Sequence, residues 1–256
     1  MGIDGTGEST PSSEERQNRD LMAGNDSRLP STGARLAWVG LFGVAFGYLE
    51  AAVVVYLRAI YYPDGFSFPL ILADMDVALV ELGRELATLL MLLGIAGLAA
   101  RSAWGRFGAF AVAFGVWDLV YYAALKVTLD WPESMATWDV LFLIPGIWTG
   151  PVWSAAAIAV FLVVCGGWIM KADAAGHRPR PGLVGWGGGA ISLLLILTSF
   201  LWNHSTTYRG EVPEWFPWPI WLTGVIVGLA TFGRLFIPVR GEQSARHTER
   251  PSPGSG

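Results

Sequence analysis

The chain has 256 residues, of which 53% are hydrophobic and only 15% are charged. A soluble domain of this size carries about 25% charged residues, so the composition indicates that lipid is the main solvent. The formal net charge of −4 argues against a nucleic-acid-binding protein, which would show a basic patch. Cys165 is the only cysteine, which excludes an intrachain disulfide.

Polar stretches at both ends of the chain enclose an apolar middle. Residues 1–33 and 240–256 contain too few apolar side chains to offset the entropy of ordering, so we predict two disordered tails. The region 34–239 contains six continuous runs of the roughly 20 apolar residues that a bilayer core requires, which favours helices over barrel strands. The predicted spans are Leu36–Leu57, Val77–Ala99, Phe107–Val127, Pro151–Met170, Leu183–Trp202 and Pro219–Ile237. The sequence therefore predicts an all-α, polytopic membrane protein with six transmembrane helices.

The start of the fourth predicted span is ambiguous. Asp139–Ile147 is also largely apolar, but Pro145 lies within it and Pro151 follows it. Because proline breaks helical hydrogen bonding, one interpretation is a short outer or re-entrant helix before the span itself.

The distribution of lysine and arginine predicts that both termini are cytoplasmic. With the N-terminus inside, thirteen cations fall on the inner side, while Arg58, Lys126 and Arg209 fall on the outer side and Arg84 lies within the second span. An excess of cations in cytoplasmic loops is typical of inner-membrane proteins. The outer loops are correspondingly acidic, and Asp139 is one of their carboxylates.

One stretch of the first predicted span is repeated in the third. Phe42–Arg58 and Phe110–Lys126 are identical at six of seventeen aligned positions, and Glu50 aligns with Asp118. Both copies run outward, so we predict two helical hairpins repeated in parallel, with an eroded third hairpin as a further possibility.

Charged residues inside the predicted spans mark a candidate site. A lipid-facing acid at the centre of a span would cost about 2.5–3.5 kcal/mol, so Glu50 and Asp118 are expected to face the protein interior. Glu81 and Glu85 are four residues apart on one helix face, with Arg84 between them. At 1.5 Å per residue, these groups all fall in the middle or the outer half of the membrane. The candidate site comprises Glu50, Glu81, Arg84, Glu85, Asp118, Tyr121, Tyr122 and Lys126.

These charges allow a purely structural interpretation as well. Glu50 with Arg84, and Asp118 with Lys126, could be plain interhelical or surface-snorkelling pairs that only fix helix register. Against this, four carboxylates face one guanidinium and one ammonium, so the cluster lacks positive charge. Excess acids in such a cluster are protonated, share a proton or bind a cation.

Three functions suit this pattern. The first is an outward-facing site for a cation or small ligand in a transporter-like or sensor-like protein, where hard carboxylates could hold a divalent cation. The second is a membrane-embedded enzyme that uses carboxylate acid–base chemistry on a lipidic substrate. The third is a non-catalytic assembly partner. The sequence requires no cofactor. It predicts contact with the lipid bilayer and no nucleic-acid partner, and it is compatible with an oligomer.

Three stretches resemble a group of multi-pass bacterial membrane proteins. They are GYLEAAVVVYLR at 47–58, FGVWDLVYY at 114–122 and TWDVLFLIP at 137–145. No activity accompanies the resemblance. It implies a bacterial inner membrane and leaves the function to the residues themselves.

Overall fold

A computed structural model describes residues 30–61 and 75–236. Within these ranges, six helices are long and apolar enough to cross a membrane, which confirms the predicted number of spans. The predicted C-terminal tail at 240–256 and nearly all of the N-terminal one lie outside the described residues. The spanning helices are α2 (Thr32–Tyr61), α3 (Met75–Ala99), α4 (Ala103–Leu129), α5 (Val152–Ala174), α6 (Leu183–Leu201, continued by the short α7, His204–Tyr208) and α8 (Trp218–Phe236).

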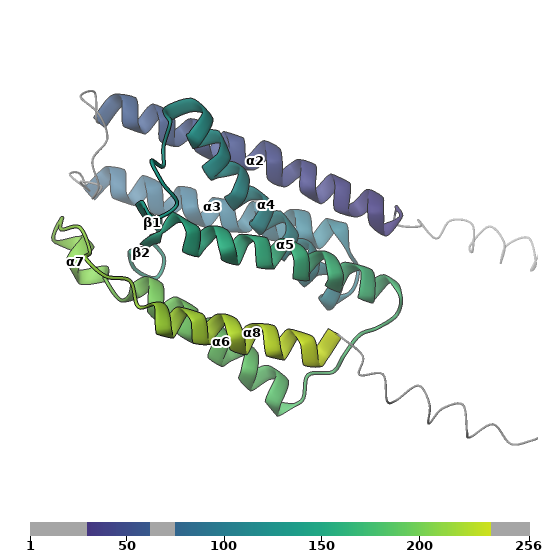
Figure 1. Cartoon of the computed structure of the whole chain (residues 1–256). Helices are drawn as coiled ribbons and strands as arrows, with labels where there is room; N and C mark the ends of the chain where they lie inside the picture. Colours follow the sequence, from purple (N-terminus) through teal and green to yellow (C-terminus); the bar gives the residue numbers. More distant parts are fainter. Residues whose placement is uncertain (1–29, 62–74, 237–256) are drawn as a thin grey trace, which may run out of the picture. The chain divides into compact units, whose positions relative to one another are not determined.

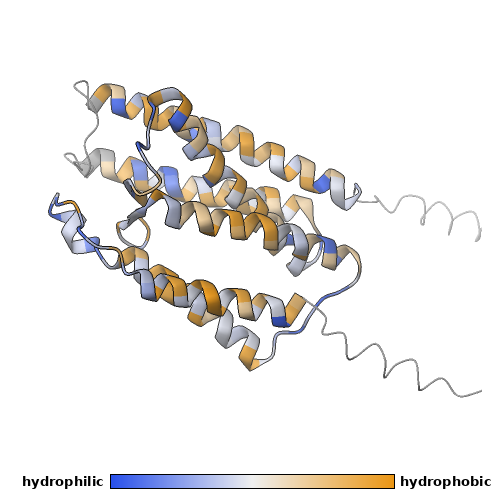
Figure 2. Ribbon diagram, in the orientation of Figure 1, coloured by the Kyte–Doolittle hydropathy of each residue, from blue (hydrophilic) through white to orange (hydrophobic). Residues whose placement is uncertain are grey.

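The surface of the long helices is suited to lipid. Large apolar side chains such as Leu98, Val127 and Leu183 are at least 80% exposed, and hydrophobic residues cover most of each long helix (Figure 2). A soluble protein rarely exposes apolar patches of this extent. The chain is therefore a multi-pass membrane protein.

Helix α4 lies at the centre of the bundle, and α2, α3 and α5 pack against it (Figure 1). Half of its membrane-spanning window is buried, more than in any other described span. Small residues on α4 permit close approach: a Cβ on Gly115 would lie 2.4 Å from the Ala159 carbonyl oxygen of α5. A Cβ on Gly47 of α2 would likewise lie 2.5 Å from the Trp117 carbonyl oxygen.

The segment before α5 is a β-hairpin, which corrects the interpretation of Asp139–Ile147 as a short helix. Strands β1 (Trp138–Phe142) and β2 (Trp148–Pro151) pair antiparallel, and Trp138 lies opposite Pro151. Prolines within and after the segment disfavour a helix, whereas the aromatic and β-branched residues of β1 suit a strand. Backbone groups that a helix would have satisfied internally are here paired between the two strands.

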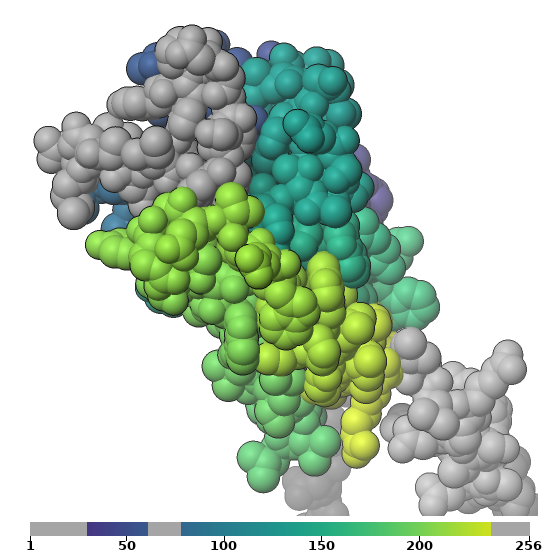
Figure 3. All heavy atoms as spheres, turned by 60° about the vertical axis from the view of Figure 1, so that its left-hand side comes forward, coloured from purple at the N-terminus to yellow at the C-terminus, as the bar shows by residue number. Residues whose placement is uncertain are grey.

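The hairpin is held on its far side by α7 and by the aromatic segment just before α8. The Ile147 N–H donates a hydrogen bond to His204 Nδ1 at 3.0 Å. Trp138 packs edge-on against Phe216, with ring centroids 6.2 Å apart. Figure 3 shows α7 and the chain that follows it, in lime, beside the teal chain between α4 and α5. Helices α6 and α8 pack on each other and meet the bundle through β2 and α5.

Candidate functional site

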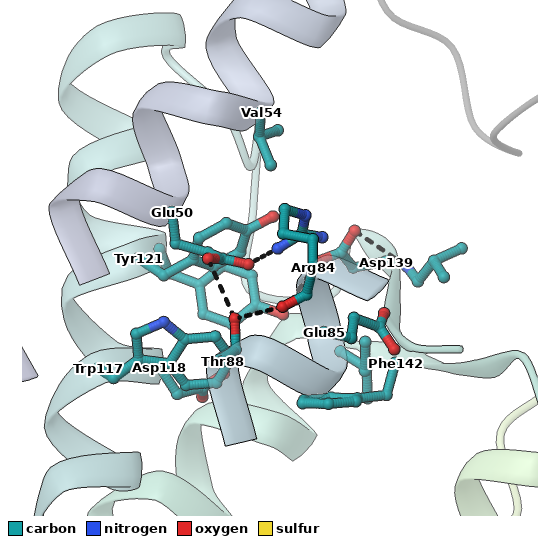
Figure 4. Close-up of a pocket in the computed structure, with 13 residues that line it drawn as sticks. Glu50, Val54, Arg84, Glu85, Thr88, Trp117, Asp118, Tyr121, Asp139 and Phe142 are labelled. Atoms are coloured by element: carbon teal, nitrogen blue, oxygen red, sulfur yellow. Dashed lines mark hydrogen bonds and ion pairs between the residues drawn. The ribbon is translucent and has the colours of Figure 1, made fainter. Parts of the chain in front are cut away.

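A small polar cavity lies between α2, α3, α4 and strand β1 (Figure 4). Its volume is about 60 Å³, which is room for a few water molecules or a compact group, because one water needs roughly 10–15 Å³. The cavity draws its charged residues from three helices and the hairpin. Its lining is Glu50, Val54, Arg84, Glu85, Thr88, Trp117, Asp118, Tyr121, Tyr122, Asp139, Val140, Leu141 and Phe142.

Arg84 connects two carboxylates on neighbouring helices. Its guanidinium forms an ion pair with Glu50 of α2, and its Nε donates to Glu81 Oε2 at 2.7 Å. Thr88 adds to this arrangement, since its hydroxyl lies 3.1 Å from the Arg84 carbonyl oxygen and 3.5 Å from Glu50. One hydroxyl hydrogen serves one strong acceptor at a time, so the shorter bond to the backbone dominates. Glu50 and Glu81 thus share one cation, Arg84.

Glu85 joins α3 to the hairpin. Both of its carboxylate oxygens accept from the Leu143 backbone N–H, at 3.0 and 2.9 Å. The side chain is buried. A hydrogen bond from this backbone donor to a carboxylate fixes the end of β1 against α3.

Tyr122 and Asp139 form a second connection between the bundle and the hairpin. The Tyr122 hydroxyl donates to Asp139 Oδ2 at 3.0 Å, and both side chains are buried. Burial raises the pKa of Asp139 to about 6, against the opposing effects of the Tyr122 hydrogen bond, the charge of Arg58 and the Val140 N–H. Asp139 therefore changes its charge just below neutral pH.

This titration predicts a pH dependence of stability. The pKa of Asp139 is about 6 in the folded protein, whereas the ordinary pKa of an aspartate is 3.8. As the pH rises, the unfolded chain therefore releases this proton before the folded protein does. The contribution of Asp139 to stability is then greatest below pH 3.8 and is lost as the pH rises toward 6. Asp139→Asn keeps an acceptor for Tyr122 and removes the titration. Melting temperatures in detergent between pH 4 and 7 are expected to show the wild type losing stability relative to this variant as the pH rises. Parallel curves would contradict the expectation.

Asp118 differs from the other lining carboxylates. Within the described part of the chain, no hydrogen bond or ion pair engages its side chain, whereas Glu50, Glu85 and Asp139 each have a partner. Beside it, Trp117 is only 6% exposed and its Nε1 has no hydrogen-bond partner among the described residues. The cavity thus contains an acceptor and borders a donor that the protein itself leaves unused.

Six of the eight residues singled out from the sequence line the cavity, and two do not. Glu81 lies just beyond it and reaches it through Arg84. Lys126 points the other way: its Nζ lies 2.7 Å from Asp130 Oδ1 and 3.1 Å from the Pro132 carbonyl oxygen. A pair between Lys126 and Asp118 is not formed. The pair between Glu50 and Arg84 is present.

Sequence reasoning missed the role of Asp139 and of Thr88. Asp139 was one of several outer acids, and only the strand places it in the cavity. The aromatic and β-branched run of β1 is the signal that could have indicated a strand.

The described residues contain no group of three or more His, Cys, Asp or Glu side chains placed to hold a metal ion. Comparisons with protein families, curated proteins and solved structures found no match to this chain. The function therefore has to be inferred from the chemistry of the cavity.

Proposed function

We propose that this chain is a bacterial inner-membrane protein that binds a small cation, or the cationic group of a small ligand, in the cavity around Asp118. The excess of cations at the predicted inner ends of the helices supports cytoplasmic termini and a cavity that lies in the outer half of the membrane. A site of this kind suits a transporter-like or sensor-like protein.

The observation that carries the proposal is the carboxylate of Asp118. A charged side chain without a partner at the centre of a membrane span costs about 2.5–3.5 kcal/mol. Acids in this position therefore mark functional sites. The neighbouring acids each have a partner, and the one lining guanidinium, Arg84, is already shared between Glu50 and Glu81. A bound cation would supply the positive partner that Asp118 lacks.

The size of the cavity limits what it holds. Sites for drug-sized ligands measure about 300–1,000 Å³, whereas this cavity measures about 60 Å³. An ion with part of its hydration shell, or one compact cationic group, fits this space.

Cation binding is tested by the thermal stability of the purified protein in detergent. A ligand at a hundred times its Kd raises stability by about 2.7 kcal/mol, which corresponds to roughly 5–10 °C for a domain of this length. We expect at least one member of a panel of Na⁺, K⁺, Mg²⁺, Ca²⁺ and small ammonium ions to produce this shift in the wild type and not in Asp118→Asn.

Asp173→Asn is the control, because Asp173 is an aspartate on a spanning helix that pairs with Arg178 Nε at 2.6 Å, at the end of α5 far from the hairpin. The control is expected to respond to the cation as the wild type does. An equal response in Asp118→Asn, or no response to any cation in the panel, would overturn the proposal.

A second candidate function is a membrane-embedded enzyme acting on a lipidic substrate, and the Tyr122–Asp139 pair favours it. A carboxylate with a pKa of about 6 is suited to general acid–base catalysis near neutral pH. This function predicts a co-purifying lipid that is converted by the wild type and left unchanged by Asp139→Asn. Recovery of the same lipid from both, unconverted, would exclude it.

A further inference from the structure

The cavity offers more than one negative charge to a ligand. Asp118 presents carboxylate oxygens without a partner, and Trp117 in its wall carries an N–H without one, both within the described residues. Indole N–H groups are donors only. A ligand that satisfies both groups therefore has to carry a cationic donor for Asp118 and an acceptor oxygen for Trp117.

The arrangement of acids disfavours a metal ion. Mg²⁺ requires six oxygen ligands and Ca²⁺ six to eight. In the described part of the chain, the acids around the cavity do not form a group of three that could coordinate a metal. Glu50, Glu85 and Asp139 already accept from Arg84, Leu143 and Tyr122.

Aromatic rings form much of the remaining wall. The Trp117 ring stacks on Tyr121 with centroids 6.5 Å apart, and it meets Phe142 edge-on at 6.2 Å. All three rings line the cavity (Figure 4). Rings of this kind attract organic cations through their π faces and pack well against carbon-bound hydrogens. A strongly hydrated inorganic ion gains less from such a wall than an alkylammonium does.

We infer that the ligand of this cavity is a compact primary ammonium with a nearby oxygen acceptor, the chemistry of an amino alcohol. This inference rests on the proposed cation site and narrows its ligand class. The ammonium donates to Asp118, the oxygen accepts from Trp117 Nε1, and the short carbon chain lies against the rings. The same group occurs free in solution and in the ethanolamine headgroup of phospholipids. The cavity volume of about 60 Å³ admits only the headgroup end of such a lipid.

The inference is tested with ethanolamine, ethylamine, tetramethylammonium, Na⁺, Mg²⁺ and Ca²⁺ as probes, using thermal stability and calorimetry of the delipidated full chain at pH 7.5. Ethanolamine is expected to bind most tightly. Ethylamine, which lacks the oxygen, is expected to bind about tenfold more weakly, since Trp117 Nε1 stays without a partner. Asp118→Asn should abolish binding of both amines.

Trp117→Phe separates a ligand contact from a structural role. The variant keeps an aromatic ring and removes only the N–H and the second ring. It is expected to weaken the binding of ethanolamine about tenfold and to leave the binding of ethylamine almost unchanged, so the two amines bind with similar affinity. Equal weakening of both amines would show that Trp117 only shapes the cavity, and it would overturn the predicted acceptor contact.

Reconstitution distinguishes the two sources of the group. If the headgroup is the ligand, nanodiscs containing phosphatidylethanolamine should stabilise the wild type more than phosphatidylglycerol nanodiscs do, and Asp118→Asn should erase the difference. If free amino alcohol is the ligand, ethanolamine stabilises the protein equally in both nanodiscs. Stabilisation through Asp118 by inorganic cations alone would overturn the inference and leave the proposed cation site standing. If no probe depends on Asp118, both fail.

Discussion

Replacing Arg84 with methionine is expected to destabilise the folded protein by about 3 kcal/mol, the lower end of the cost of breaking a buried ion pair. Arg84 serves both Glu50 and Glu81, and its side chain is 25% exposed, so water offsets a part of the loss. The variant leaves the Glu50 carboxylate in the bundle without a cation. Chemical or thermal unfolding in detergent measures the change.

A second substitution tests this explanation. Adding Glu50→Gln to Arg84→Met removes the uncompensated charge, so the double variant is expected to recover at least half of the lost stability. The control is Arg209→Gln, which breaks the exposed pair with Glu211 and is expected to cause no measurable change. If Arg84→Met unfolded like the wild type, the ion pair between Arg84 and Glu50 would make no measurable contribution to stability.

The number and position of the spans could be predicted because the bilayer imposes a single physical rule. A run of about 20 apolar residues has one stable arrangement in lipid, the helix. The ends of the helices were less predictable. Helix α2 begins at Thr32 and ends at Tyr61, beyond the predicted Leu36–Leu57, because helical hydrogen bonding continues through flanking residues that the apolar run does not include.

The candidate site was predictable only where charge interrupts an apolar run. Glu50, Glu85 and Asp118 stand out for that reason, and all three line the cavity. Asp139 does not stand out in the sequence, because an acid in a loop between two spans is expected to be solvated by water. Only the pairing of β1 with β2 brings it inward.

The proposed pair of Asp118 with Lys126 fails on geometry. Eight residues of helix separate the two by about 12 Å along the axis. Lys126 instead reaches forward to the carbonyl oxygens of Asp130 and Pro132 after the end of α4, as cations near helix C-termini commonly do. Sequence alone suggested a charge pair, and the helical rise decides against it.

The predicted duplication gains a physical rationale from its aligned glycines. Gly47 meets the backbone of α4 at Trp117, and Gly115 meets the backbone of α5 at Ala159. Each glycine lies three residues before the acid of its own copy, Glu50 or Asp118. Positions three residues apart lie on neighbouring parts of one helix face, so the glycine that permits close packing also directs the acid toward the interior.

Close packing through glycine predicts opposite effects at two adjacent positions of α5. A Cβ on Gly166 would lie 2.7 Å from the Gly108 carbonyl oxygen and 3.0 Å from the Val112 nitrogen, both backbone atoms of α4, whereas a Cβ on Gly167 meets nothing within 4 Å. Gly166→Ala therefore has to separate α4 from α5, at an expected cost of about 3 kcal/mol or more. Gly167→Ala is expected to leave stability unchanged or to raise it by up to about 1 kcal/mol, because alanine favours the helix. Unfolding of the two variants under identical detergent conditions makes the comparison. Equal stability of the two would mean that α4 and α5 do not pack through these glycines, and the helix that carries Asp118 would lose its defined position.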